Sequence, residues 1–364
     1  MKFKAGLRMF TTQILKVKPE SISFKGDTPV ISDVTTRENL ILVAQRLKET
    51  SDVVGFPTET VYGLGGSALN DESVKNIYKA KNRPADNPLI VHISLVEQLR
   101  RKILPKGYDI PSAYHGLLEQ FWPGPLTILL PNDPSKSPLS QYVTAGQDTF
   151  AVRMPRHPVA RALIALSDTP LAAPSANALT RPSPTQAQHV YHDLHGKIPY
   201  ILDGGACEVG LESTVVDGLA NPPMLLRPGG VSAEQIQKYG GSAWTNLVRA
   251  KKTAAEDEKV RTPGMKYRHY SPSAKVVLFV GGSNGEQAVQ KYLNGVEDGA
   301  KIALLSASRF KPAADLLSRI SIERSMGKDG AEILRNMFAM LREVDELGVD
   351  LILVEGVEES NEGL

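Results

Sequence analysis

The pattern of hydrophobic and polar positions predicts a domain in which helices and short buried strands are mixed. Thr35 and Glu38 are spaced as a capping box and precede an apolar stripe at helical spacing, so a helix is expected there, with Leu40, Ile41, Ala44 and Leu47 on its buried face. The run DVVGF then predicts a buried strand that ends at Pro57. PTETVYGLGG follows and predicts a loop rich in hydroxyl groups and glycine.

The same pattern continues up to about residue 240. A second helix is expected to begin at Asn70 and to stop before Pro84, and PLIVHI predicts the next strand. Ser94 and Glu97 form another capping box, which predicts a third helix. Further strands are predicted at 126–130, 150–153, 171–173, 200–203, 213–216 and 224–227, and further helices at 157–167, 185–194 and 232–238.

The pattern changes after residue 248 and predicts a second, smaller domain. RAKKTAAEDEKVRT is charged and poor in apolar residues, which indicates an exposed linker over 249–274. KVVLFV, KIALLS and DLILVE then predict three strands of a small parallel βαβαβ unit, Rossmann-like, over 275–364. The expected division is therefore a basic leader or tail over 1–19, an α/β domain over 20–248, the linker, and the small domain.

Composition limits the class of protein. The 364 residues are 41% hydrophobic and 23% charged, which allows an ordinary core. A net charge of +2 is low for a protein that coats nucleic acid. The single cysteine, Cys207, suits a reducing compartment, and no apolar run is long enough for a membrane helix. Five Lys or Arg without an acid in the first 18 residues leave a mitochondrial leader as an alternative to a cytoplasmic protein with a basic tail.

Two segments carry candidate chemistry. In KAKNRPADNPLIVH, Lys79, Lys81 and Arg83 come where a helix ends, prolines stiffen the loop, and a buried strand anchors it, so a phosphate site is favoured over a solvated basic face. A Walker-type loop is absent, so any use of ATP follows another design. APSANALTRPSPT presents Ser175 and Asn177 just after a predicted strand, where ligands of α/β sheets gather.

Other candidates are weaker. Arg153 and Arg227 end predicted strands, where a surface ion pair is the alternative to a functional role. Gly63, Gly65 and Ala68 fit a G-x-G-x-x-A pattern but lack the tight strand-to-helix turn of a dinucleotide site, so a flexible glycine loop is expected. The histidines spaced three apart at 189, 192 and 195 drift around a helix, and no metal site is expected.

Eight motifs in order carry a family resemblance: FPTETVYGLGG, KAKNRPADNPLIVH, FWPGPLT, AVRMPRHP, APSAN, STVVD, LLRPGG and PGMKYRHYSP. Together they resemble the YrdC-type threonylcarbamoyl-AMP synthases in the long form with a C-terminal Rossmann-like extension. The resemblance implies a twisted mixed-sheet domain with a large concave cleft. It also implies a nucleotidyltransferase that converts L-threonine, bicarbonate or CO2 and ATP to threonylcarbamoyl-AMP and pyrophosphate, with Mg2+ on the phosphates.

The resemblance also implies site residues. Lys81 and Arg83 fall on the family's catalytic Lys-x-Arg pair. ATP is expected to contact Arg83, Asn87, Thr149, Ser175, Asn177, Ser183, Arg227, His269 and Tyr270. Threonine is expected to contact Thr60, His92, Arg153, Ala173 and Ser213. The linker, with Tyr267, is expected to act as a lid. A partner transferase is expected to pass the product to ANN-reading tRNAs, so that tRNA meets this chain indirectly, and no membrane partner is expected.

Two other functions remain open from the residues. One is an RNA-binding module without catalysis, which explains the basic loop but not the hydroxyl-rich loops. The other is a different carbamoyl-handling enzyme, although the zinc-finger and acylphosphatase modules of hydrogenase-maturation carbamoyltransferases are absent from the sequence. The resemblance also has a departure: the chain stops at NEGL, where family tails continue into a helix, so a less stable small domain is expected.

Overall fold

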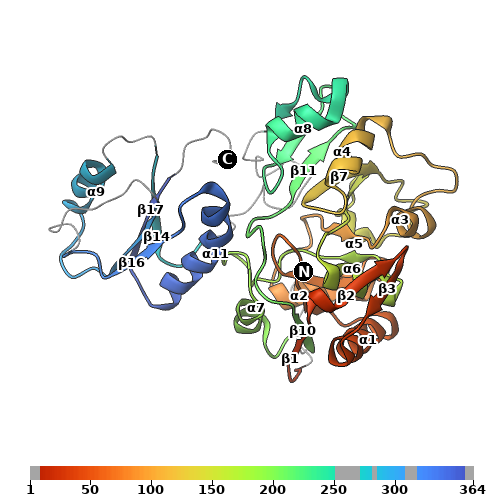
Figure 1. The fold of residues 1–364 in the computed structure, drawn as a ribbon, viewed down its shortest axis with the longest axis horizontal. Coiled ribbons are helices and arrows are strands. Elements are labelled where there is room, and N and C mark those ends of the chain that lie inside the picture. Colours follow the sequence, from red (N-terminus) through yellow and green to blue (C-terminus); the bar gives the residue numbers. More distant parts are fainter. Residues whose placement is uncertain (1–8, 251–270, 281–284, 308–317, 357–364) are drawn as a thin grey trace. The chain divides into compact units, whose positions relative to one another are not determined.

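The computed structural model describes residues 9–250, 271–280, 285–307 and 318–356 (Figure 1). The chain divides into two compact units. Most of the first 250 residues form the first unit, whereas the second contains the C-terminal part together with two short segments, Thr180–Ser183 and Glu208–Leu211.

A mixed eleven-stranded sheet organises the first unit, in the order β1-β10-β4-β5-β9-β6-β8-β7-β11-β12-β13. Strands β6 and β8 are parallel neighbours, and β9 and β7 flank them in the antiparallel sense. The strands are β1 Gln13–Lys16, β4 Val54–Phe56, β5 Gly63–Ser67, β6 Ile90–His92, β7 Leu126–Pro131, β8 Thr149–Arg153, β9 Leu171–Ala172, β10 Tyr200–Asp203, β11 Thr214–Asp217, β12 Met224–Arg227 and β13 Val248–Arg249. A separate hairpin joins β2 Ile22–Lys25 to β3 Thr28–Ile31.

Helices cover the two faces of this sheet unequally. α1 and α6 pack together over β10, β4 and β9, in a core that includes Leu40, Leu163 and Phe56. The larger core lies on the other face, below α2, α3 and α7. The helices of the unit are α1 Val34–Glu49, α2 Asp71–Lys81, α3 Val96–Lys102, α4 His115–Phe121, α5 Gln141–Thr144, α6 Pro158–Ser167, α7 Ala187–Leu194 and α8 Ala233–Gly240, with 3-10 turns at Pro19–Ser21, Ser112–Tyr114 and Gly241–Trp244.

The sheet face that α1 and α6 cover extends across β6, β8 and β7, where it carries different side chains. Leu171 of β9 packs in the core of α1 and α6, and it pairs in register with His92, so both side chains lie on the same face. Farther along this face a small apolar cluster contains Ile90, Ala151 and Leu129. On these strands the face therefore carries polar side chains next to this small apolar cluster.

Several expectations are confirmed and others are wrong. The predicted strands at 126–130, 150–153, 200–203 and 224–227 are present. The helices expected to begin at Asn70 and at Ser232 are also present as α2 and α8, and those two residues are their N-caps. Both predicted N-terminal capping boxes are wrong. Asp33, one residue before α1, accepts the Thr36 N–H, and α3 begins after Leu95 without a side-chain cap.

The loop predicted for PTETVYGLGG is wrong in its second half, because Gly63–Ser67 form a buried strand, β5, which pairs with β4. Small residues are required because a Cβ on Gly65 would lie 2.7 Å from Cε1 of Phe56. Within the segment expected as a leader or tail, Gln13–Lys16 form β1 and pair with β10. Residues 1–8 lie outside the described part of the chain.

The second unit contains a parallel sheet in the order β14-β17-β15-β16. Its strands are β14 Lys275–Phe279, β15 Ile302–Ser306, β16 Ile322–Ser325 and β17 Leu351–Glu355, so the three expected strands are present together with one that was not predicted. α9 Gly285–Leu293 and α11 Gly330–Glu346 connect them. The expectation about a final helix concerns the end of the chain, outside the described ranges, and most of the predicted linker lies outside them as well. Within those ranges, no helix is both long and apolar enough to cross a membrane.

Candidate active site

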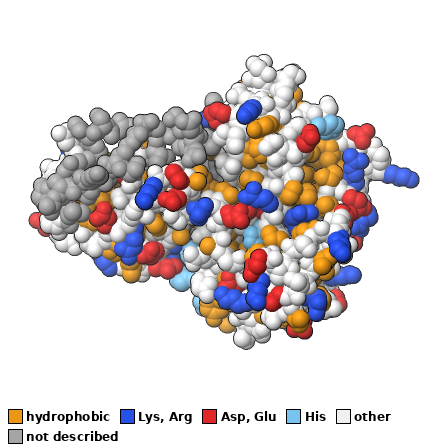
Figure 2. All heavy atoms as spheres, viewed as in Figure 1, with side chains coloured by type: hydrophobic (Ala, Val, Ile, Leu, Met, Phe, Trp, Pro, Cys, Tyr) orange, Lys and Arg blue, Asp and Glu red, His pale blue; other side chains and the backbone are white. Residues whose placement is uncertain are grey.

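Strand register places five polar positions in one row across the first unit. His92 pairs with Arg153, and Arg153 pairs with Thr127 on the next strand. Thr127 pairs with Val215, and Val215 with Arg227. Paired residues project to the same face of a sheet, so His92, Arg153, Thr127 and Arg227 point to one side, together with Ser213, whose Oγ lies 2.8 Å from Oγ1 of Thr127. Figure 2 shows basic and histidine side chains among hydrophobic ones on this unit.

Arg153 is the central cation of this row. It is only 3% exposed, and each guanidinium nitrogen makes a hydrogen bond. Nε donates to the Gly124 carbonyl (3.1 Å), Nη1 to Oγ1 of Thr60 (2.9 Å) and Nη2 to Oε1 of Glu59 (2.6 Å). One N–H remains on each terminal nitrogen of the guanidinium. These N–H groups are available to donate to a carboxylate.

The hydroxyl of Thr60 has a fixed proton direction. Thr58 donates its only hydroxyl proton to the Val61 carbonyl (2.6 Å), so in the 2.8 Å contact between the Thr58 and Thr60 hydroxyls Thr60 is the donor. Thr60 also accepts from Arg153. The hydroxyl of Thr60 can therefore only accept from a ligand.

Ser213 connects the residues predicted to bind threonine with those predicted to bind ATP. The Arg227 side chain donates to the Ser213 carbonyl from Nε (3.1 Å) and Nη2 (2.9 Å), and Nη2 also lies 3.1 Å from Oγ of Ser213. Arg227 was expected with ATP and Ser213 with threonine. Their contact means that the two predicted subsites adjoin at this end of the row.

His92 is neutral in this environment. Burial, followed by the charge of Arg153, lowers the pKa of His92 to about 3. Its Nδ1 lies 3.1 Å from the Ile90 carbonyl, which requires a proton on Nδ1. The rings of Phe56 and His92 meet edge to face, with their centroids 6.3 Å apart, and this contact holds the imidazole against the core. A neutral imidazole adds no charge to compete with Arg153 for an anion.

The basic loop and the Ser-x-Asn loop meet at the other ends of these strands. Lys81, 3% exposed, donates to the Ser175 carbonyl, to the Asn177 carbonyl (2.6 Å) and to Oδ1 of Asn177 (3.1 Å). The Ser175 hydroxyl donates to the same Oδ1 (2.6 Å). Lys81 thus directs three ammonium donors at one loop, so the structure gives it a positioning role in addition to its charge.

Arg83, Asn87 and Thr149 lie near this end. Arg83 is buried, with Cζ 6.0 Å from the Tyr78 ring centroid. Asn87 is fully buried, and neither its Oδ1 nor its Nδ2 has a hydrogen-bond partner among the described residues. Thr149 begins β8, whose other end is Arg153. An unsatisfied buried amide is costly, so Asn87 indicates a site for a polar ligand.

The places of Ser183, His269 and Tyr270 in the site remain predictions. Ser183 is buried but belongs to the second unit. His269 and Tyr270 lie outside the described residues, as does the lid segment around Tyr267. Ala173 contributes backbone, since its N–H donates to the Ile90 carbonyl (3.0 Å).

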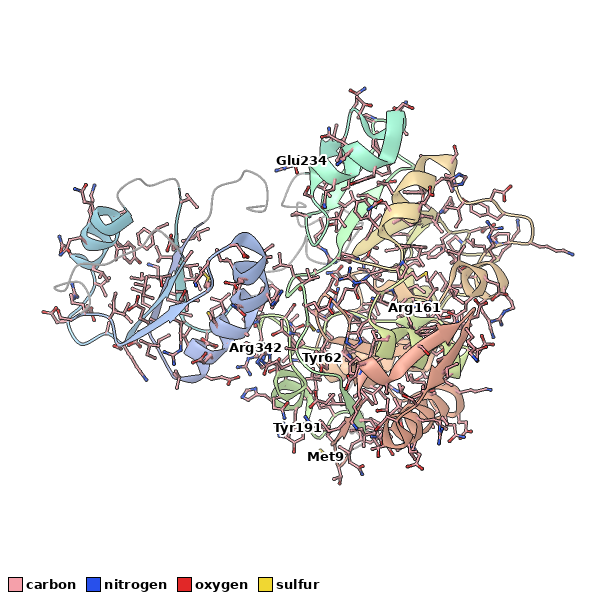
Figure 3. All side chains as sticks on the ribbon, in the orientation of Figure 1. Met9, Tyr62, Arg161, Tyr191, Glu234 and Arg342 are labelled. Atoms are coloured by element: carbon pink, nitrogen blue, oxygen red, sulfur yellow. The ribbon has the colours of Figure 1, made fainter. Side chains whose placement is uncertain are left out.

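Sequence reasoning missed several residues that hold the site together. Glu59 pairs with Arg153, Thr58 orients Thr60, and Asp193 accepts the Ala178 N–H (3.0 Å) next to Asn177. Tyr62, labelled in Figure 3, accepts the Ala176 N–H at its carbonyl (2.8 Å) and donates its hydroxyl to the Gly205 carbonyl (2.7 Å). Glu59 and Thr58 were visible in PTET, but a local pattern does not identify their partners.

The described residues contain no group of three or more His, Cys, Asp or Glu side chains that could hold a metal ion. The three histidines near α7 turn to different partners. His189 accepts the Thr185 N–H, His192 contacts Asp193, and His195 contacts the Tyr191 carbonyl.

Family models match nearly the whole chain. The model that groups Sua5, YciO and YrdC proteins, described as "Telomere recombination", matches residues 47–229. A second model, described as "Threonylcarbamoyl-AMP synthase, C-terminal domain", matches residues 231–364. The two matches together cover most of both units of the chain.

Individual relatives agree with these matches. The threonylcarbamoyl-AMP synthase of Schizosaccharomyces pombe is 54% identical, over 90% of this chain and 86% of its own, and that of Bacillus subtilis is 41% identical, over 92% and 93%. The crystal structure of Pyrococcus abyssi Sua5 complexed with L-threonine superposes with a TM-score of 0.80 at 40% identity, covering 96% of this chain and 94% of that one. The chain belongs to the threonylcarbamoyl-AMP synthase family and is an enzyme of the nucleotidyltransferase type.

Proposed function

We propose that the row from His92 to Arg227 binds L-threonine and that the Lys81–Asn87 end binds ATP, so that the chain forms threonylcarbamoyl-AMP and pyrophosphate from threonine, bicarbonate and ATP. The observation that carries the proposal is Arg153, a buried arginine with one N–H left on each terminal nitrogen beside a neutral histidine and an accepting hydroxyl. The solved relative complexed with L-threonine supports threonine as the ligand.

The row fits each polar group of threonine. The carboxylate pairs with the two remaining N–H groups of Arg153, because a planar guanidinium binds two carboxylate oxygens at once. The hydroxyl or the ammonium group donates to Thr60, which can only accept. Ser213 supplies a second hydroxyl close by. A site built to bond a substrate hydroxyl rejects valine far more strongly than a methyl pocket distinguishes threonine from serine.

The chemistry needs positive charge more than a strong base. The threonine amine and bicarbonate give a carbamate and water, and a carbamate oxygen then attacks the α-phosphorus of ATP as pyrophosphate leaves. Both partners in the second step are anions, so fixed cations favour their approach. Arg83 and Lys81 supply that charge at the phosphate end, and Arg153 does so at the amino acid. The nucleophile is already charged, so the attack requires no general base.

The phosphate end is held ready for the nucleotide. Lys81 fixes the Ser175–Asn177 loop, and the amide of Asn87 gains a partner only when a ligand arrives. Thr149 and Arg153 stand at opposite ends of β8, about 13 Å apart for a five-residue strand, so the proposed phosphate and threonine ends are separated by the length of one short strand. Mg2+ enters as part of the substrate, bound to the phosphates of ATP.

The later fate of the product follows from the family's reaction. A separate transferase would move the threonylcarbamoyl group to adenosine beside the anticodon, so that tRNA meets this chain only indirectly. We place the chain in the cytoplasm, which suits its single buried thiol, Cys207. A mitochondrial pool remains the alternative suggested by the basic first residues.

Threonine-dependent release of pyrophosphate from ATP tests the proposal. The full chain with L-threonine, bicarbonate and Mg·ATP is expected to release pyrophosphate and to form an adenylate with the mass of threonylcarbamoyl-AMP. Omitting threonine or bicarbonate should abolish both signals, and valine should not replace threonine. Pyrophosphate release that is independent of threonine would contradict the assignment of the row from His92 to Arg227.

A further inference from the structure

Glu59 is a buried acid beside Arg153 in the active-site region, and it takes no part in the proposed chemical steps. It follows β4 within PTET and is 1% exposed. Isolated ionised carboxylates are rarely buried, since the loss of hydration is costly unless partners replace the water. Its contacts therefore need an explanation beyond packing.

Both carboxylate oxygens of Glu59 are used, and for different partners. Oε1 accepts from Nη2 of Arg153 at 2.6 Å, in an ion pair whose side chains are 1% and 4% exposed. Oε2 lies 3.1 Å from the backbone nitrogen of Arg156 and 3.4 Å from that of His157. His157 is the N-cap of α6, so one carboxylate joins the end of β8 to the beginning of the next helix.

We propose that Glu59 is a positioning residue for threonine: it aligns the guanidinium of Arg153 and fixes the backbone turn that follows β8. The inference rests on the proposed function, because it assigns to Arg153 the carboxylate of threonine. Glu59 touches no reacting atom in this scheme. It acts through Arg153.

The geometry explains why alignment is needed. An arginine side chain has several rotatable bonds, and a bidentate carboxylate pair requires the guanidinium plane in one orientation. Gly124, Thr60 and Glu59 hold one N–H on each of its nitrogens, which leaves the last two N–H groups pointing in set directions. Glu59 is the charged member of the three, so it makes the strongest of these bonds.

A neutral isostere cannot reproduce this arrangement. In glutamine, one oxygen can serve either Arg153 or the backbone N–H groups of Arg156 and His157, and the amide nitrogen then faces a donor. Charge also matters: burial raises the pKa of Glu59, but the charge and hydrogen bond of Arg153 together with the Arg156 N–H outweigh burial and hold that pKa below its usual value. Glu59 is therefore ionised at neutral pH and balances Arg153 before substrate binds.

The test is the Glu59→Gln variant of the full chain, assayed by pyrophosphate release with each substrate varied in turn. We expect KM for threonine to rise about tenfold or more, the change that a loss of roughly 1.4 kcal/mol in binding produces. KM for ATP at saturating threonine should stay within about twofold, because Glu59 does not contact the Lys81–Asn87 end. A split between the two KM values is a readout that a general loss of folding does not give.

Asp52→Asn is the matched control. Asp52 is another nearly buried carboxylate paired with an arginine, Arg46, but it lies at the end of α1 away from the row. This variant should lose thermal stability while both KM values stay unchanged. If Glu59→Gln gives no soluble protein, Glu59→Asp carries the same test, since it keeps the charge on an arm one methylene shorter.

The outcomes separate the two proposals. An unchanged KM for threonine in Glu59→Gln, or equal rises for threonine and ATP, overturns the role of Glu59 while the proposed function stands. Pyrophosphate release by the unaltered chain that does not depend on threonine overturns the proposed function itself.

Discussion

At the scale of single residues, Asn87 is expected to lower the stability of the protein and to contribute to the binding of ATP. Its side-chain amide is buried and without a partner among the described residues, which costs about 1–3 kcal/mol in the unliganded protein. Leucine has the same branched heavy-atom skeleton without the polar atoms. The Asn87→Leu variant should therefore unfold at higher urea concentration than the original chain, while its KM for ATP rises about tenfold or more.

Tryptophan fluorescence measures this change in the right unit, because both tryptophans, Trp122 and Trp244, lie in the first unit. Asn76→Leu is the control. The Asn76 amide donates to the Ser51 carbonyl at 2.9 Å, so its removal should lower stability by about 1 kcal/mol. Destabilisation of Asn87→Leu to the same extent as Asn76→Leu would show that Asn87 is already satisfied without ATP.

Residue identities were more predictable than their partners. Lys81 was expected to face the phosphates, yet its donors point to the Ser175–Asn177 loop, about 95 positions away in sequence. Arg153 and His92 were recognised from their motifs, but Glu59 was not, because its role depends on a strand that is distant in sequence. Motifs identify polar residues, whereas only the fold decides which of them compete for the same proton.

At the scale of elements, the packing around β5 leaves no room for a side chain at Gly65. Gly65 lies against the Phe56 ring, and a Cβ there would also lie 3.2 Å from Cδ1 of Leu171. We expect Gly65→Ala to lower the free energy of unfolding by about 1–3 kcal/mol, since a fully buried ring has little room to move. Urea unfolding followed by tryptophan fluorescence measures the loss.

A double-mutant cycle identifies the cause. Leucine at position 56 lacks the Cε1 atom that meets the new methyl group, so the combined Gly65→Ala and Phe56→Leu variant should lose less stability than the sum of the two single variants. Additive losses would mean that the strand tolerates the methyl group and that backbone conformation causes the defect.

Three of the strands that the sequence did not predict share one property. β1, β5 and β16 are short and contain glycine or polar residues, so no hydrophobic run marks them. Each is a strand because a partner strand accepts it: β10 pairs with β1, β4 with β5, and β15 with β16. By contrast, β7 and β8 contain mostly buried apolar residues, and these strands were predicted from their own composition. Pairing between distant segments is the information that a local pattern lacks.

At the scale of the whole molecule, charge separates an enzyme that handles a small product from a module that holds RNA. The chain has 42 Lys and Arg against 40 Asp and Glu. Several of the basic side chains in the first unit are already engaged: Lys81 in the Ser175–Asn177 loop, Arg153 with Glu59, and Arg101 with Asp168. The positive charge of these three side chains is therefore balanced or used within the protein, and a net charge of +2 does not indicate a continuous track for a phosphate backbone.

We accordingly expect weak binding of tRNA and no effect of tRNA on the reaction. Unmodified ANN-reading tRNA, titrated against the full chain by fluorescence anisotropy at two salt concentrations, should show little affinity, because each phosphate contact requires an available cation. Added tRNA should also leave the rate of threonine-dependent pyrophosphate release unchanged. Tight binding that weakens steeply with salt, together with release that requires tRNA, would instead favour the RNA-binding alternative and would place a nucleic-acid surface on this chain. The Glu59→Gln variant sharpens the distinction: it should alter the use of threonine without altering whatever weak affinity for tRNA the chain has, since Glu59 is buried and no phosphate can reach it.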